Sequence, residues 1–295
     1  MFDIIKRIVD DSSIQDRFNR MPDDYKKDPN YQLNWLYSAS AVAKADLLTR
    51  DRDDSLKRGE RLAQWLHEEK FEKLRLHIWQ RNRISHKLVY DVQNDLHNNP
   101  RAASSVSLEK NIARLMCRES IKGHLFGQIG KVLNFEVPLY EAKSEPYRCI
   151  DMVSYSEAED KLYLLELKKP RSQESLLRCI LEVYTYVKAI GDWESFRDNF
   201  SQRDGVGIGK ETKIVIAPLV FETVAAKAHK KSDKSVPYED YQMMESASFV
   251  DKLLADIRTD LQRHFDDDAN HLEFAFLNEK DPVIKGLLQE LGLDS

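Results

Sequence analysis

Residues 147–169 read YRCIDMVSYSEAEDKLYLLELKK, and this stretch decides the fold of the chain. Two largely apolar segments, at residues 148–155 and 161–169, flank the polar sequence SEAED. Runs of this length on either side of a short polar turn are typical of a β-hairpin. The sequence therefore predicts an antiparallel pair of strands at the centre of the fold.

The register of this hairpin decides where its charged side chains lie. A turn centred between residues 158 and 159 sets Asp151 opposite Glu166, and Lys168 lies on the same face as Glu166. Opposed side chains have Cβ atoms about 4.5–5.5 Å apart, so two carboxylates in this arrangement repel each other. A bound divalent cation would offset that repulsion. A slip of one residue would send Asp151 to the opposite face.

Asp151, followed on the next strand by Glu166-Leu167-Lys168, resembles the D…(D/E)xK core of the PD-(D/E)XK nuclease superfamily. Ile150 stands where a proline usually precedes the aspartate of that motif. The resemblance implies a restriction-endonuclease-like fold, an α/β (α+β) protein with an αβββαβ core and a central mixed sheet.

Periodic segments around the hairpin predict the other elements of that core. The sequence DGVGIGK, at residues 204–210, has no strand before it and no Ser or Thr after its lysine, so it predicts a flexible connection rather than a phosphate-binding loop. The expected elements, in chain order, are a helix from Ser107, a strand at 132–140, a helix at 173–190, a strand at 213–219, a helix at 251–265, a strand at 271–277 and a helix at 282–291.

The chain divides at the linker sequence NNPRAASS into a predicted N-terminal helical domain, residues 1–100, and a nuclease-like domain, residues 106–295. Residues 73–87 carry a tryptophan and several basic residues without an acidic one. This composition is typical of an amphipathic helix with a solvated basic face, and also of nucleic-acid contact. The basic residues of this stripe are Lys73, Arg75, Arg81, Arg83 and Lys87.

The resemblance also implies a metal site and catalytic roles. Asp151, Glu166 and the backbone carbonyl of Leu167 would bind Mg²⁺ or Mn²⁺, because hard cations prefer oxygen ligands. Lys168 would orient the attacking water or stabilise charge on the phosphate. Just beyond the motif, Lys169 and Arg171 would meet the backbone of the nucleic acid, as would Arg178 on the next helix.

Two further glutamates receive roles from the same resemblance. The first helix of the nuclease fold carries a glutamate that points at the metal, and Glu119 takes this role as a ligand, directly or through water, with Glu109 as its rival. A glutamate that only reaches the edge of the helix is the structural alternative to both. Glu182 stands where related families carry a glutamine, with Tyr186 four residues later. It would orient Lys168 or the water, or else pair with Arg178.

Composition limits the classes of function. The 295 residues carry a formal net charge of −5 at pH 7, which argues against a protein that coats nucleic acid non-specifically but permits a nuclease with a local basic surface. The three cysteines have neither metal-site spacing nor an even count, so buried reduced thiols and a cytoplasmic location are expected. No apolar run of about eighteen residues is present, so no membrane span is expected.

Together these features predict a metal-dependent nuclease that hydrolyses phosphodiester bonds, with DNA as the favoured substrate and with defence or DNA processing as the context. A lone site of this type cuts one strand, so double-strand cleavage would need a homodimer or two successive nicks. One alternative is a catalytically silent nuclease fold that binds nucleic acid or a protein partner. The other is a chain whose functional centre is the N-terminal helical region, for example a partner-binding bundle with the nuclease-like part as its effector. For the hairpin itself, the structural alternative is an exposed pair of strands in which Glu166 and Lys168 form a weak salt bridge.

Overall fold

The computed structural model describes residue 67 and residues 108–138, 149–170, 176–190, 192–204, 206–221 and 249–293. The predictions for the N-terminal domain, its basic stripe and the linker lie outside these residues, as does Arg171. The fold and the site are therefore described for the region that the sequence assigns to the nuclease-like domain.

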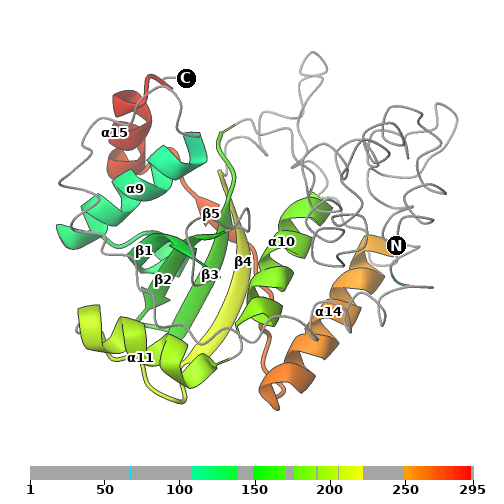
Figure 1. The fold of residues 1–295 in the computed structure, drawn as a ribbon. Helices are drawn as coiled ribbons and strands as arrows, with labels where there is room; N and C mark the ends of the chain where they lie inside the picture. The colour runs from blue at the N-terminus through cyan, green and yellow to red at the C-terminus, as the bar shows by residue number, and fades with distance from the viewer. Residues whose placement is uncertain are drawn as a thin grey trace, which may run out of the picture.

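A five-stranded mixed sheet forms the centre of the described fold (Figure 1). The first three strands form an antiparallel meander, and the last two add to it in parallel, so that the order across the sheet follows the chain. This is the α+β arrangement with a mixed sheet that the sequence predicts. The strands are β1 (Lys131–Pro138), β2 (Cys149–Ser156), β3 (Lys161–Leu167), β4 (Lys213–Phe221) and β5 (Ala275–Leu277).

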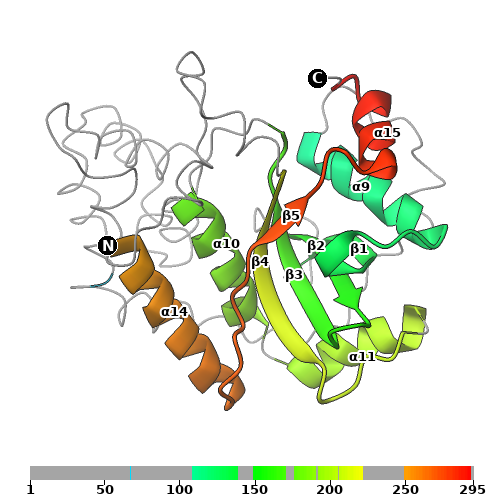
Figure 2. The ribbon, with the colours of Figure 1, turned by 180° about the vertical axis from the view of Figure 1, so that it is seen from behind.

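Helices cover both faces of the sheet (Figures 1 and 2). An apolar cluster that includes Met116, Leu165 and Leu287 packs α9 and α15 on one face. On the other face α10 contacts β3 and β4, and α14 packs outside it through a hydrogen bond from Tyr184 to Asp260, 2.6 Å long. The helices are α9 (Leu108–Ile121), α10 (Leu176–Ala189), α11 (Trp193–Asp204), α14 (Phe249–Phe265) and α15 (Pro282–Glu290), with a 3-10 turn, η2 (Gly127–Ile129).

The β2–β3 hairpin has the predicted register. Its paired residues run from the turn to Met152 and Leu165, which places the centre of the turn between residues 158 and 159. Carried one step further, the same register sets Asp151 opposite Glu166. The strand predicted at 213–219 is also present as β4, a nearly all-apolar strand that lies parallel to both of its neighbours inside the sheet.

Helix α11 is not predicted from the sequence. Its apolar residues are few: Phe196 and Phe200 are buried, while most of the other positions are polar or charged. A signal for its beginning is nevertheless present, because the Asp192 carboxylate accepts a hydrogen bond from the Ser195 amide, 3.0 Å long, as an N-cap residue does. Residues 206–212 then connect α11 to β4, where the sequence predicts a connection.

Two expectations from composition can be compared with the structure. All three cysteines lie in the described part of the chain and none of them forms a disulfide; two are buried and Cys149 is half-buried. Burial raises the pKa of the Cys149 thiol to about 11, so this thiol is protonated at neutral pH. None of the described helices combines the length and the apolar character that a membrane span requires.

Gly130 joins η2 to β1 at a point where no other residue fits. Its φ is 66°, and a Cβ atom added there would lie 2.3 Å from the Tyr155 carbonyl oxygen. We predict that Gly130→Ala lowers the free energy of unfolding by at least about 1–3 kcal/mol, measured by denaturant unfolding.

Gly286→Ala is the matched control for this change. Gly286 lies inside α15 with open space around the added Cβ atom, so alanine should raise stability by about 0.5–1 kcal/mol through helix propensity. Equal effects of the two substitutions would contradict the described packing of Gly130.

Candidate active site

The candidate site lies at the end of β3, on the face of the sheet that α10 covers. Glu166 and Lys168 project to this face because side chains two residues apart on a strand point the same way. Glu182 and Tyr186 lie one turn apart on α10. Glu166, Lys168 and Glu182 are 6%, 4% and 1% exposed, so each charge needs a partner inside the protein.

These four residues form one hydrogen-bonded group, which we call the Lys168 cluster. The Lys168 ammonium donates to Glu166 Oε1 at 2.6 Å and to Glu182 Oε2 at 3.1 Å. The Tyr186 hydroxyl donates to the other carboxylate oxygen of Glu166. The structure thus brings together Glu166, Lys168 and Glu182, which the sequence assigns to the site. Because Glu166 and Lys168 are both buried, their ion pair is not the exposed surface salt bridge of the structural alternative.

Asp151 lies beside this cluster and is half-buried. Its Oδ2 atom accepts a hydrogen bond from the Leu167 amide, 3.0 Å long, which fixes the carboxylate at the point where the hairpin pairing ends. Burial raises the pKa of Asp151 well above its usual value, and the charge of Glu166 raises it further, while Lys168 and the Leu167 amide act in the opposite direction. The two carboxylates therefore repel each other, as the predicted register requires.

The structure separates the two candidate glutamates of the first helix. The charge of Glu109 raises the pKa of Asp151, so Glu109 acts on the site. Among the described residues, Glu119 instead accepts hydrogen bonds from Arg118 and Lys122, 3.0 and 2.9 Å long. The two glutamates are ten residues apart on α9, which corresponds to about 15 Å along the helix axis. The effect of Glu109 is the last in size among those on the pKa of Asp151, so which of the two glutamates serves the site stays a prediction.

The predicted nucleic-acid contacts are described only in part. Lys169 is partly buried and follows the Lys168 cluster directly. Arg178 lies on α10, four residues before Glu182, but its side chain lies outside the described part, as do Arg171 and the basic stripe at residues 73–87. Their role in binding stays a prediction.

The donor atoms of the site fit a hard divalent cation. Asp151 and Glu166 offer carboxylate oxygens, and with Glu182 they set three carboxylates against the one ammonium of Lys168. Within the described ranges, no three His, Cys, Asp or Glu side chains are placed to hold a metal ion by themselves. Mg²⁺ is commonly held by only one or two carboxylates, together with water and substrate phosphate, so the carboxylate pair is a sufficient protein contribution.

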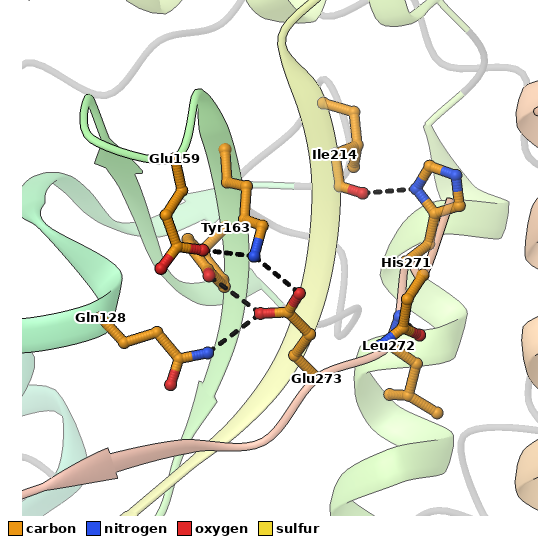
Figure 3. Close-up of polar contacts among 9 residues, drawn as sticks. Gln128, Glu159, Tyr163, Ile214, His271, Leu272 and Glu273 are labelled. Carbon is orange, nitrogen blue, oxygen red and sulfur yellow. Dashed lines mark hydrogen bonds and ion pairs between the residues drawn. The ribbon is translucent and has the colours of Figure 1, made fainter. Parts of the chain in front are cut away.

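A second polar network holds the opposite end of β3 and is not predicted from the sequence (Figure 3). Glu273, which precedes β5, accepts hydrogen bonds of 2.9 Å from Gln128, Lys161 and Tyr163. Burial raises the pKa of the Tyr163 hydroxyl to about 12, so this hydroxyl remains a donor at neutral pH. The network ties η2 and the C-terminal segment to the start of β3.

Comparisons of the chain with protein-family models, with curated proteins and with solved structures gave no match. Function is therefore inferred from the geometry of the site and from the motif that the hairpin carries.

The charge of Asp151 should destabilise the folded protein in the absence of a divalent cation. A carboxyl group whose pKa is raised by folding destabilises the folded protein increasingly as the pH rises from its unfolded pKa to its folded pKa, and this cost is lost again as the pH falls through the same range. Asparagine keeps an oxygen acceptor for the Leu167 amide and removes the charge. We predict that Asp151→Asn unfolds at a higher temperature than the wild type at pH 8 in EDTA, and that this difference shrinks on acidification. A variant that is less stable at every pH would contradict the electrostatic description.

Proposed function

We propose that the chain is a divalent-metal-dependent nuclease with an active site of the PD-(D/E)XK type. The observation that carries the proposal is the position of Asp151, whose carboxylate accepts a hydrogen bond from the Leu167 amide, beside Glu166, which is in contact with Lys168. The order α9, β1, β2, β3, α10 and β4 supports it, because it follows the core that the motif implies, with α11 inserted before β4.

Each residue of the site has a role in this proposal. Asp151, Glu166 and the Leu167 carbonyl are the ligands for Mg²⁺ or Mn²⁺. The cation, when bound, polarises the phosphate and lowers the pKa of water. Lys168, held between Glu166 and Glu182, presents its ammonium to the phosphate or to the attacking water. The Leu167 amide keeps the Asp151 carboxylate in one orientation.

Nucleic acid, with DNA favoured, is the proposed substrate. Its backbone charge suits a site in which a cation and the Lys168 ammonium lie together, with Lys169 adjacent in the chain. A single site cuts one strand, so cleavage of both strands would require a homodimer or two successive events. Defence or DNA processing is the proposed context by analogy with other proteins that carry this motif.

Cleavage of end-labelled duplex DNA, single-stranded DNA and RNA tests the proposal. With Mg²⁺ or Mn²⁺ the wild type should cut at least one of these substrates, and EDTA should stop it. We predict that Glu166→Gln and Lys168→Met each lower the rate at least about 100-fold, because the first removes a ligand of the cation and the second removes an ammonium that stabilises charge in the transition state.

Asp260→Asn serves as the matched control. Asp260 is also a buried carboxylate, bonded to Tyr184 on α10, but it lies outside the Lys168 cluster, so its loss should leave the cleavage rate near that of the wild type. Metal-independent cutting, or equal rates in the wild type and both site variants, would overturn the proposal. An inert wild type that binds nucleic acid without binding metal would favour the catalytically silent alternative.

A further inference from the structure

Among the described residues, the Lys168 ammonium contacts two buried carboxylates that come from different elements. Glu166 belongs to β3 and lies 2.6 Å from Nζ, whereas Glu182 belongs to α10 and lies 3.1 Å from it. A lysine ammonium has three N–H donors, so it can hold both contacts at once. The ammonium is therefore connected to the sheet and to the helix.

Glu166 and Glu182 differ in their other contacts and in their proposed roles. Glu166 also accepts the Tyr186 hydroxyl and, with Asp151, is the proposed cation ligand. A divalent cation on Glu166 would compete with Lys168 for the same carboxylate and would repel its ammonium. Glu182 lies deeper, at 1% exposed, on the helix side of the ammonium. It can keep its contact with Lys168 while Glu166 changes partner.

We propose that Glu182 anchors the Lys168 ammonium when Glu166 binds a divalent cation, and that this anchor sets the affinity of the site for the cation. Glu182 is then a positioning residue rather than a ligand. The inference rests on the proposed function, since it assumes that Asp151 and Glu166 hold the metal.

The expected direction follows from charge. Without the carboxylate of Glu182, the ammonium would lose one of its anionic partners and would interact more strongly with Glu166, so the cation would have to displace a stronger ion pair. The site would also lose one negative charge that attracts the cation. Both effects weaken binding, and second partners of metal sites commonly change affinity by about 10–100-fold.

Calorimetric titration of the full-length protein with Mn²⁺ alone tests this inference. Glu182→Gln keeps the size of the side chain and removes its charge, and it should raise the Kd for Mn²⁺ about 10–100-fold. Asp260→Asn, which removes a buried carboxylate from α14, should leave the Kd unchanged. If the wild type binds and Glu182→Gln binds equally well, the inference is overturned and the proposed function stands. If the wild type does not bind Mn²⁺, the proposed function fails as well.

Repeating the titration in a Lys168→Gln background distinguishes anchoring of the ammonium by Glu182 from direct attraction between the Glu182 charge and the cation. In Lys168→Gln no ammonium remains to be anchored, so adding Glu182→Gln should raise the Kd by a smaller factor than it does in the wild type. Equal factors in the two backgrounds would show that Glu182 acts without Lys168 and would overturn the anchoring role. Circular dichroism of each variant establishes that the comparison is made between folded proteins.

Discussion

The pairing of β2 with β3 is the constraint on which the site depends. Met152 and Leu165 face each other in this register and belong to the apolar cluster under α9, so the core holds the two strands in place. Because side chains alternate between faces, a slip of one residue would turn Asp151 toward that apolar cluster and move Glu166 out of register with it. Burial of apolar side chains on one face therefore fixes a pair of repelling carboxylates on the other.

Repulsion between the Asp151 and Glu166 carboxylates lowers the stability of the folded protein, and packing elsewhere in the fold has to offset this loss. The pKa of Asp151 is raised by burial and by Glu166, which means that its ionised form is unfavourable in the folded protein. β4 lies buried beside β3 along its whole length, and the Glu273 network holds the start of β3. Unfavourable electrostatic interactions of this kind are common at functional sites, where the arrangement that function requires lowers the stability of the fold. The local geometry thus agrees with a site that is completed by a cation.

Local sequence patterns predict most of the central sheet, but they do not predict contacts between residues that are distant in the sequence. The polar turn and its apolar flanks place the hairpin, and the all-apolar run places β4. The choice between Glu109 and Glu119 requires the phase and position of α9, which spacing alone leaves open. The Glu273 network joins residues more than a hundred positions apart, which local patterns do not report. Helix α11 has few apolar residues, so its sequence does not show the helical periodicity on which the prediction of a helix depends.

Anomalous diffraction from crystals soaked in Mn²⁺ tests the proposed metal site itself, because it locates the cation without requiring that the substrate be known. We expect an anomalous peak beside the end of β3, between the carboxylates of Asp151 and Glu166. A fully soaked crystal with no peak between these carboxylates, or with Mn²⁺ held only elsewhere on the protein, would contradict it.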